Sequence, residues 1–290
     1  MPDMRTVVLA TCERWPDIST SDAVLAAELQ RRGHHVRAQS WNGGSFDVFA
    51  TADIVVLRSN WDFHHDLVGF ALWLDALDQT DVAVHNPTSL VRDYLDKSYL
   101  VQLVDAGFPT PATLYVNDLD DRRVDDWLRE SELERVVLKP AWGASGHGVE
   151  LVETSELASV RSRWRNAPEH RDAILQAFAP QIRNGERSLV FFDGVFSHGL
   201  LRSPGDDDFR VNSQYGGSMT LADDIDAPMI ELGQRVIDSF DAPATYARID
   251  MVCRNDDLVL MEVEVNEPAL GLDLAPGAAA AFADAILRVD

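Results

Sequence analysis

Apolar, strand-like segments recur along this chain, and what separates them changes from the first third to the last. In residues 1–88, segments with helical spacing fill the gaps between them. The expected order is strand 6–10, helix 22–32, strand 36–38, strand 53–57, helix 67–77 and strand 82–85. Strands that are connected through helices pair in parallel, because a parallel connection must cross back over the sheet. We therefore expect an N-terminal parallel α/β domain, with ligands bound beyond the carboxyl ends of its strands.

The rest of the chain follows two further patterns. Residues 89–178 mix helices, expected at 89–106, 124–130 and 155–165, with strands at 135–138 and 173–178. Residues 179–290 contain strands joined by short turns, which is typical of antiparallel sheet. Here we expect strands at 188–192, 195–201, 245–252 and 258–265, turns at 193–194 and 255–257, and helices at 229–240 and 278–287. The predicted fold class is α/β with α+β lobes, in three domains: 1–88, 89–178 and 179–290.

A glycine-rich segment, KPAWGASGHG at residues 139–148, directly follows a predicted strand. Loops with such glycine spacing expose consecutive backbone N–H groups that can surround a phosphate. The segment is not a Walker A loop, because its lysine precedes the glycines instead of following them. Only two of the 25 basic residues are lysines, Lys97 and Lys139, and an ammonium is a compact charge suited to one phosphate oxygen. We interpret the segment as a nucleotide-binding loop; a plain hairpin turn is the alternative.

Acidic side chains gather on two predicted neighbouring strands. Glu262, Glu264 and Asn266 alternate with valines, so all three are expected on one face of their strand, and Asp250 lies on the strand before it. Carboxylate and amide oxygens are hard ligands suited to Mg²⁺, and two such ions could hold the phosphates of a nucleotide. The alternative is a solvated acidic face. We favour the metal, because the strands are otherwise apolar and buried carboxylates need a cation to offset their desolvation.

Three arginines, Arg202, Arg210 and Arg248, stand in otherwise acidic surroundings. Fixed cations stabilise the charge that spreads over a phosphoryl group during its transfer. Taken singly, each arginine fits a surface ion pair better, so this interpretation depends on the nucleotide and metal signals nearby. Two weaker candidates are residues 176–179, which could offer backbone groups to an adenine ring, and Glu186, which could hold a ribose or an active-site arginine.

The composition also narrows the class of partner. A formal net charge of −23 argues against binding to a nucleic-acid backbone, which depends on clustered basic residues. Uncharged apolar runs such as 274–282 are too short to span a bilayer. Two cysteines, Cys12 and Cys253, provide no disulfide framework and fit a reducing cytoplasm. We expect a cytoplasmic protein that binds neither nucleic acid nor membrane.

In this order, the motifs resemble the ATP-grasp superfamily over essentially the whole chain, and most closely its branch of glutathione synthetases and RimK-type ligases. The nearest subgroup includes the O-ureido-D-serine cyclo-ligases of D-cycloserine biosynthesis. The segments that carry these resemblances are RSNWDFH at 58–64, SLVFFDGVFSHGLLRSP at 188–204, DFRVNSQYGGS at 208–218 and EVEVNEP at 262–268. The resemblance implies an ATP-grasp fold in which the N-terminal parallel α/β domain is the pre-grasp domain.

The resemblance also implies roles for residues of this sequence. ATP would be bound by Lys97, Lys139, Gly143, Ser145, Gly146, Gly148, Gln176, Ala177, Phe178, Ala179 and Glu186. Magnesium would be held by Asp250, Glu262, Glu264 and Asn266, although in glutathione synthetase an asparagine ligand stands at the place of Glu264. The transferred phosphoryl group would be held by Arg202, Arg210 and Arg248. The second substrates are expected between the lobes, at Arg58, Trp61 and Asp62, with core packing as the alternative for Trp61.

The expected activity is ADP-forming ligation of a small, amino-acid-like carboxylic acid to an amine through an acyl phosphate, with ATP and two Mg²⁺ ions. Three alternatives stay open: an intramolecular cyclo-ligase of the O-ureido-D-serine type, a RimK-like ligase that modifies peptides or proteins, and a non-catalytic nucleotide-binding protein. Many relatives in the family are dimers, and this is the basis for expecting a homodimer.

Overall fold

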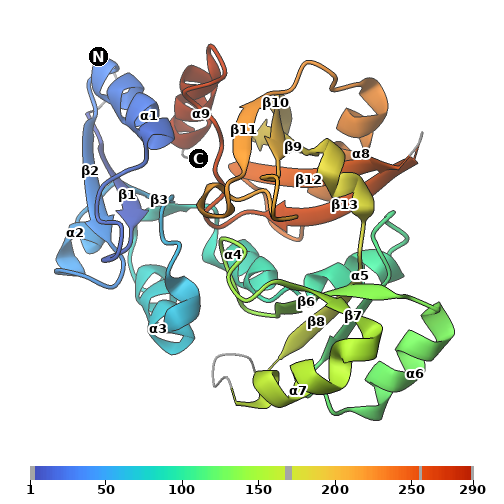
Figure 1. Ribbon diagram of the computed structural model, residues 1–290. Coiled ribbons are helices and arrows are strands. Elements are labelled where there is room, and N and C mark those ends of the chain that lie inside the picture. The colour runs from blue at the N-terminus through green and yellow to red at the C-terminus, as the bar shows by residue number, and fades with distance from the viewer. Residues whose placement is uncertain (1–3, 167–171, 255–256, 289–290) are drawn as a thin grey trace.

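The computed structural model describes residues 4–166, 172–254 and 257–288, and within them the chain forms three sheets (Figure 1). The first part of the chain alternates strands with helices. Its elements are β1 (Thr6–Thr11), α1 (Thr20–Arg31), β2 (His35–Ser40), α2 (Asp47–Ala50), β3 (Ile54–Leu57), the 3₁₀ helix η1 (Phe63–His65), α3 (Leu67–Asp78) and β4 (Ala83–His85). The strands pair in parallel in the order β2-β1-β3-β4, which confirms the predicted parallel sheet.

Both faces of this parallel sheet are covered, and the alternation of side chains along β1 shows how. Val7 and Leu9 pack in a core with Leu25 of α1, whereas Val8 and Ala10 pack on the opposite face in a core with α2 and α3. A strand that is buried on both faces reads as a continuous apolar run, as residues 7–10 of β1 do.

The middle of the chain forms a small antiparallel sheet with helices on one face. Its elements are α4 (Thr88–Leu95), α5 (Tyr99–Asp105), β5 (Thr113–Val116), α6 (Arg122–Ser131), β6 (Arg135–Pro140), β7 (Glu150–Glu153), η2 (Thr154–Glu156), α7 (Leu157–Arg165) and β8 (Ala173–Ala177). The sheet order is β5-β8-β6-β7. Helices α6 and α7 share a core with its strands, whereas α4 and α5 contribute Leu90 and Leu100 to the core of the C-terminal sheet.

The C-terminal part forms a five-stranded antiparallel sheet in the order β11-β10-β9-β12-β13. Its elements are η3 (Pro180–Asn184), β9 (Glu186–Phe192), β10 (Val195–Ser203), η4 (Ser213–Tyr215), β11 (Ser218–Leu221), α8 (Ala227–Ile237), β12 (Tyr246–Arg254), β13 (Asp257–Glu264) and α9 (Ala278–Leu287). The predicted α/β fold class is confirmed, and α9 has the bounds that were expected. Residues 255–256 of the turn predicted at 255–257 lie outside the described residues.

One predicted helix is wrong. Residues 89–106 form two helices, α4 and α5, with Asp96 between them in an extended conformation. The Asp96 carboxylate accepts a hydrogen bond from the backbone N–H of Ser98 at 2.8 Å, and such local bonds compete with a helical backbone. The break allows the Lys97 backbone N–H to donate to the carbonyl oxygen of Ala141 at 2.8 Å, beside the end of β6.

Several short elements were not predicted. Helix α2 and the strands β5, β7 and β11 have four residues each. A segment of this length holds too few positions for a periodic pattern to stand out, and these four lack the uninterrupted apolar run by which the equally short β3 was predicted. These strands become visible only through their partners in the sheet.

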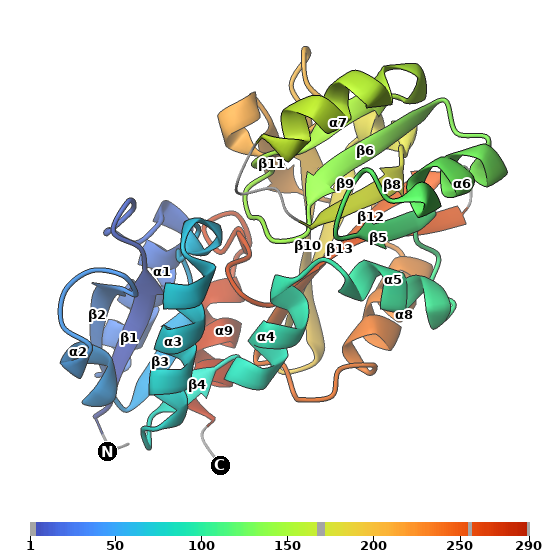
Figure 2. The same ribbon diagram turned by 90° about the horizontal axis from the view of Figure 1, so that it is seen from below.

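The C-terminal helix belongs structurally to the N-terminal sheet. Figures 1 and 2 show α9 beside α1, and Phe282 and Ile286 of α9 lie in one core with Val7 of β1 and Phe192 of β9. Arg32 forms an ion pair with Asp284 of α9 at 2.5 Å. The first and third parts of the chain therefore share a hydrophobic core, and the boundaries at 88 and 178 stay a proposal about domains.

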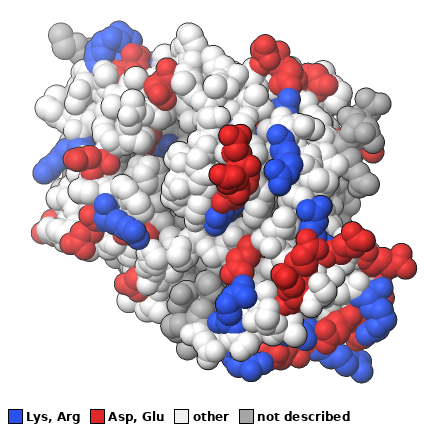
Figure 3. Space-filling view, viewed as in Figure 1, with Lys and Arg blue, Asp and Glu red and all other residues white. Residues whose placement is uncertain are grey.

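The described helices lack the combination of length and apolar character that crossing a membrane requires. On the face shown in Figure 3, basic and acidic side chains are interspersed.

Asn86 joins the parallel sheet to the C-terminal sheet. Its buried amide donates to the carbonyl oxygens of Tyr246 at 2.8 Å and Val265 at 2.7 Å, and accepts from the N–H groups of Thr245 at 2.7 Å and Tyr246 at 3.1 Å. One side chain thus satisfies backbone groups from two strand ends.

We expect Asn86→Ala to lower the free energy of unfolding by about 3 kcal/mol, because it leaves buried backbone groups without hydrogen bonds. Chemical denaturation followed by circular dichroism measures the change. The matched control is Asn117→Ala, since Asn117 is exposed and its loss should cost less than about 0.5 kcal/mol. Equal effects of the two substitutions would contradict the joining role.

Candidate active site

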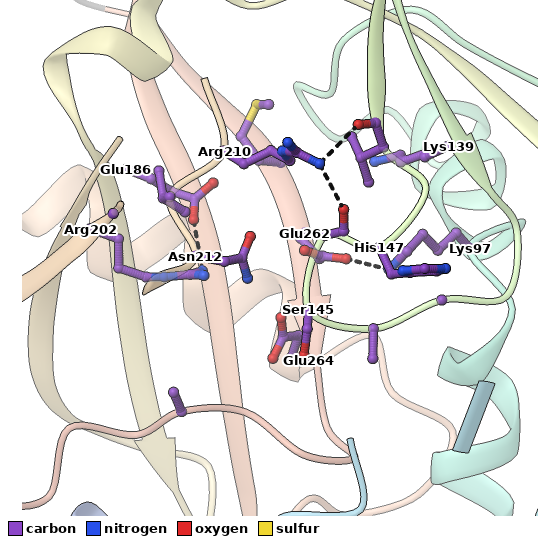
Figure 4. A pocket seen from close by; sticks show the side chains of 18 of the residues that line it. Lys97, Lys139, Ser145, His147, Glu186, Arg202, Arg210, Asn212, Glu262 and Glu264 are labelled. Carbon is purple, nitrogen blue, oxygen red and sulfur yellow. Dashed lines mark hydrogen bonds and ion pairs between the residues drawn. The ribbon is translucent and has the colours of Figure 1, made fainter. Parts of the chain in front are cut away.

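A cavity of about 710 Å³ opens between the small sheet and the C-terminal sheet. The ends of β6 and β8, the glycine-rich loop, β12, β13 and the segments that follow β1 and β3 all contribute to its lining. Figure 4 shows Lys97 and Lys139 on one side, Glu186 and Arg202 on the other, and Glu262 and Glu264 between them. Residues far apart in the sequence thus converge on one space.

Both lysines reach this cavity. Lys139 ends β6 as a buried side chain, and its ammonium donates to the Gln176 side-chain oxygen at 3.0 Å. Lys97 comes from the break between α4 and α5 and forms an ion pair with Glu262 at 2.5 Å. Burial and the nearby Lys97 charge lower the pKa of Lys139 to about 8. An anion beside Lys139 would stabilise its charged form.

The glycine-rich loop, residues 143–148, has the backbone shape of an anion-binding turn. Ser145, Gly146 and Gly148 have φ angles of 55°, 70° and 69°, in the left-handed region where consecutive N–H groups can point to one side. A Cβ atom on Gly146 would lie 2.8 Å from the Asn212 side-chain oxygen, so glycine is required there for space as well as conformation.

A second segment, residues 208–217, clasps this loop. Gln214 donates to the carbonyl oxygen of Ser145 at 2.5 Å, and the Tyr215 hydroxyl donates to that of Gly146 at 3.3 Å. Arg210 stacks over the Tyr215 ring at 3.3 Å, pairs with Asp208 at 2.7 Å, and its Nη1 lies 3.5 Å from the Gly146 carbonyl oxygen. Arg210 lines the cavity as expected, but its present contacts hold the loop.

The carboxylates of Glu262 and Glu264 line the cavity, and the buried carboxylate of Asp250 lies beside them. One oxygen from each of Asp250, Glu262 and Glu264 lies within 4.8 Å of the others. The register of the sheet explains this, because Asp250 is paired with Glu262 and Arg248 with Glu264 across β12 and β13. The sequence predicted three of the four members correctly as neighbours.

Asn266, the fourth expected member, lines the same cavity but lies just beyond the end of the strand, and its role as a ligand stays a prediction. Strand β13 ends at Glu264, so the alternation of faces does not continue to Asn266. The Asn266 side-chain oxygen instead accepts a hydrogen bond from Asn60 at 2.8 Å. Asn266 therefore connects the C-terminal sheet to the end of β3.

Arginines compensate the buried acids. Arg248 holds Asp250 through two nitrogens at 2.8 Å each and reaches Glu264 at 2.6 Å. Arg202 pairs with Glu186 at 2.9 Å and with Asp250 at 3.1 Å. The prediction that Glu186 contacts an active-site arginine is thus seen in the geometry, because Glu186 and Arg202 face each other across β9 and β10.

The pKa values show a site with surplus negative charge. Burial, and then the charge of Asp250, raise the pKa of Glu186 to about 8. Burial, and then the charge of Glu264, raise the pKa of Glu267 to about 8. Burial acts in the same direction on Glu262, but the ammonium groups of Lys97 and Lys139 outweigh it and lower the pKa of Glu262 to about 2. Added cations would therefore stabilise the ionised acids.

This donor set fits Mg²⁺. It offers only carboxylate oxygens, which are hard ligands, and they are close enough together to share one ion. The structure carries no ligands, and in it Arg248 and Lys97 occupy positions beside the same oxygens.

The expected adenine segment borders the cavity. Gln176, Ala177, Phe178 and Ala179 all line it. The Ala177 N–H donates to the carbonyl oxygen of Ala112 at 2.8 Å, and the Phe178 ring meets Phe209 edge to face at 5.9 Å. The segment forms an apolar wall at the small-sheet end of the cavity.

Of the three expected substrate contacts, only Trp61 lines the cavity. The buried Arg58 pairs with Asp22 at 2.8 Å and donates to the Pro268 carbonyl oxygen at 2.8 Å. The buried Asp62 accepts from the side chains of Trp41 at 2.7 Å and Asn42 at 3.0 Å. Neither Arg58 nor Asp62 is part of the cavity lining, and most of their polar atoms bond within the fold, so a direct substrate contact for them stays an untested prediction.

Sequence reasoning missed several lining residues, including Trp15, Asn212, Gln214 and Glu267. Glu267 belongs to the EVEVNEP segment, so the sequence showed that its neighbours are acidic, but not that it lines the cavity. Trp15 follows the first predicted strand, so the segment after that strand reaches the cavity, as the segment after β3 does.

Comparison with known proteins identifies the family. Residues 103–272 match the family model described as prokaryotic glutathione synthetase, ATP-grasp domain, which covers more than half of the chain. The chain belongs to the ATP-grasp ligases. Residues 7–86 match a second model, the N-terminal domain of the D-cycloserine synthetase DcsG.

Individual ATP-grasp relatives agree with this assignment. The cycloserine biosynthesis protein DcsG of Streptomyces lavendulae is 29% identical over 265 residues, covering 85% of this chain and 86% of that protein. The glutathione synthetase of Rhodopseudomonas palustris is 26% identical over 167 residues, which cover 57% of this chain and 51% of that enzyme. The chain thus matches about half the length of this glutathione synthetase.

Solved structures show the same fold. The crystal structure of the D-cycloserine synthetase DcsG has a TM-score of 0.85 at 24% identity, covering 97% of this chain and 98% of that one. D-Alanine–D-alanine ligase from Bacillus anthracis has a TM-score of 0.68 at 14% identity, covering 98% of this chain and 95% of that one. ATP-grasp enzymes use ATP and Mg²⁺: the B. anthracis ligase was solved with ATP, and the ligase PsnB with Mg and ADP.

We expect Glu262→Gln and Glu264→Gln each to weaken Mn²⁺ binding at least about tenfold, because each removes a charged ligand from the cluster. Electron paramagnetic resonance of free Mn²⁺, a stand-in for Mg²⁺, measures this without catalysis. The matched control, Glu153→Gln, changes an exposed residue of β7 and should leave the affinity as it is. Unchanged binding in both cluster variants would remove them from the metal site.

Proposed function

We propose that the chain is an ADP-forming ligase that joins the carboxylate of a small, amino-acid-like molecule to a nitrogen nucleophile. The observation that carries this is the arrangement around one cavity: two ammonium groups and a glycine-rich loop meet the carboxylates of Glu262 and Glu264, with Asp250 buried beside them. A nucleotide triphosphate with its cations complements such a charge pattern, since its phosphates suit the former and its metal ions the latter.

In the proposed reaction, a carboxylate oxygen of the substrate attacks the γ-phosphorus of ATP, and the bond to the bridging oxygen breaks to release ADP. Lys97, Lys139 and the loop N–H groups stabilise the phosphate charge. Two Mg²⁺ ions at Asp250, Glu262 and Glu264 would neutralise the phosphates of the nucleotide.

Arg248 and Arg202 are held beside these carboxylates by their ion pairs, so their positive charge is fixed before substrate arrives. Fixed charge needs little rearrangement during the reaction and therefore lowers the barrier. In the second step, the nitrogen nucleophile attacks the acyl phosphate and displaces inorganic phosphate. Positioning supplies most of the rate, so a strong dedicated base is not required.

The nitrogen nucleophile distinguishes two versions of this function. An intermolecular ligase uses an amine from a second molecule. An intramolecular cyclo-ligase uses a nitrogen of the same molecule, as in the O-ureido-D-serine type. The match of residues 7–86 to the DcsG N-terminal domain, which precedes the ATP-grasp domain here, favours the second version as the alternative to test first.

The proposed chemistry also bears on the location of the protein and on its partners. ATP and small-molecule substrates place the enzyme in the cytoplasm, where the two free cysteines stay reduced. We expect neither nucleic acid nor membrane as a partner, given the net charge of −23. We propose a homodimer only because many relatives in the family are dimers.

Lys139→Ala should reduce carboxylate-dependent ADP release at least about a hundredfold and weaken Mg-ATP binding, because a buried phosphate contact is lost. Lys139→Arg should be impaired as well, since the planar guanidinium cannot fill the place of a compact ammonium. The exposed Arg129→Ala is the control for a lost basic residue. ADP release by coupled assay and binding of a fluorescent ATP analogue measure both effects; near-normal values for Lys139→Ala would reject the role.

Product analysis separates the two versions. With O-ureido-D-serine as the sole organic substrate, a cyclo-ligase should release ADP and form a product of lower mass than the substrate. An intermolecular ligase should release ADP only when an amine is added, and its product should have a higher mass. Mass spectrometry of the reaction mixture reads this directly.

A further inference from the structure

One corner of the cavity combines two indole rings with a carboxylate. Trp15, Trp61 and Glu267 all line the cavity there. The two indoles meet edge to face with ring centroids 5.8 Å apart. The Trp61 indole N–H donates to the carbonyl oxygen of Glu267 at 3.2 Å, so Trp61 and the acidic residue are held side by side.

The Glu267 carboxylate stands apart from the other acids of the site. Glu186, Asp250, Glu262 and Glu264 each form an ion pair with a lysine or an arginine. Within the described residues, the Glu267 side chain takes part in neither an ion pair nor a hydrogen bond. It is only partly buried and faces the cavity, so a ligand can reach it. A half-buried carboxylate without a partner is costly unless a cation joins it.

The corner is held rigidly by the join between the end of β3 and the segment after β13. Arg58 donates to the Pro268 carbonyl oxygen at 2.8 Å, and Asn60 to the Asn266 side-chain oxygen at 2.8 Å. The Tyr246 hydroxyl lies 2.9 Å from the Asn266 carbonyl oxygen. These bonds fix the residues on both sides of Glu267 and the segment just before Trp61, so both residues are positioned before a ligand arrives.

We propose that Trp15, Trp61 and Glu267 form a subsite for the ammonium group of an amino-acid-like substrate. This deepens the proposed function and rests on it. Indole faces attract cations through their ring electrons, and a carboxylate adds a charge-assisted hydrogen bond. Together they select a positively charged nitrogen over a neutral group of the same size.

The charges around the corner agree with this assignment. Arg14, which is outside the lining, lies 5.0 Å from the Trp15 ring centroid, so this indole already accepts one cation. Lys97 is committed to Glu262 at 2.5 Å. The neighbouring carboxylate of Glu264 adds negative potential near Glu267, which favours a cation further.

The subsite assigns a role to each end of the substrate. An ammonium held at Glu267 stays protonated, and a protonated nitrogen has no lone pair with which to attack. This nitrogen is therefore recognised, and a different nitrogen acts as the nucleophile. The substrate carboxylate is left to face the phosphate-binding side of the cavity, and an α-hydroxy acid, which lacks the cation, should be a poor substrate.

The test uses tryptophan fluorescence of the full-length protein with Mg²⁺ and a non-hydrolysable ATP analogue. O-Ureido-D-serine, D-serine and D-alanine are each titrated against the corresponding 2-hydroxy acid. We expect quenching by the amino compounds at concentrations at least tenfold lower than by their hydroxy partners. Glu267→Gln, which keeps the shape and removes the charge, should raise the dissociation constants of the amino compounds roughly 10- to 100-fold.

Two controls keep the result interpretable. Glu13→Gln makes the same chemical change at an exposed residue outside the cavity lining and should leave binding unchanged. Trp61→Leu should weaken binding of the amino compounds and reduce the quenching. The proposal would be overturned by equal binding of amino and hydroxy compounds, or by unchanged binding in Glu267→Gln. It would also be overturned if no amino compound changed the fluorescence up to about 100 mM, which is the weakest affinity that a useful site could have.

Failure of the subsite and failure of the ligase can be told apart. Fluorescence reports binding without turnover, whereas ADP release with hydrolysable ATP reports the reaction. Selective binding of amino compounds without ADP release would sink the proposed ligase and keep the ammonium subsite. ADP release with equal rates for amino and hydroxy acids would keep the ligase and sink the subsite.

Discussion

The electrostatic balance on the buried face of β12 and β13 is the constraint on which the site depends. Asp250, Glu262 and Glu264 lie within one ligand sphere, and ionised carboxylates so placed repel each other strongly unless cations separate them. The compensating charges come from different parts of the chain: Arg248 from the same sheet, and Lys97 from the break between α4 and α5. The ion pairs that neutralise these acids therefore also connect the segments that surround the cavity, so the fold and the function depend on the same charged residues.

The lobes around this cavity are held together with unequal strength. The parallel sheet and the C-terminal sheet share a continuous apolar core through α9, and Asn86 adds buried hydrogen bonds between them. The glycine-rich loop is held differently, by polar contacts to Gln214 and Tyr215 and by ring contacts of His147 with His64 and His65. Burial, and then the neighbouring histidines, lower the pKa of His64 to about 4, so its own ring is neutral at pH 7. Polar surface contacts exchange with water at low cost, and the loop is therefore the element best suited to admit a nucleotide.

Sequence patterns captured what depends on local period and on rare residue types. The apolar runs of β1 and β3 marked a sheet covered on both sides, and the scarcity of lysine drew attention to Lys97 and Lys139, which both line the cavity. The sequence patterns failed where the contacts of a residue depend on the direction that its side chain takes in the folded chain. Arg58 and Asp62 follow a strand end that faces the cavity, but they turn into the fold to reach Asp22 and Trp41. Asn266 lines the cavity as Glu262 and Glu264 do, but its strand stops two residues earlier and its side-chain oxygen bonds to Asn60, which the alternation did not indicate. Trp15 and Glu267 could not be paired from sequence, since they are 252 positions apart (267 − 15) and no local pattern connects them.

Arg248 and a divalent cation would compete for the same carboxylate oxygens. The guanidinium occupies both oxygens of Asp250 and one of Glu264, and its remaining hydrogen-bond contact is the Ala269 carbonyl oxygen at 3.3 Å. An ion that takes oxygens from Asp250 and Glu264 weakens these pairs, because each oxygen has a limited number of lone pairs to share. The guanidinium would then be free to pair with another anion, such as a phosphate group of a bound nucleotide. The buried ion pairs with Asp250 and Glu264 therefore hold Arg248 beside the carboxylates, where an arginine would be available to stabilise a transferred phosphoryl group.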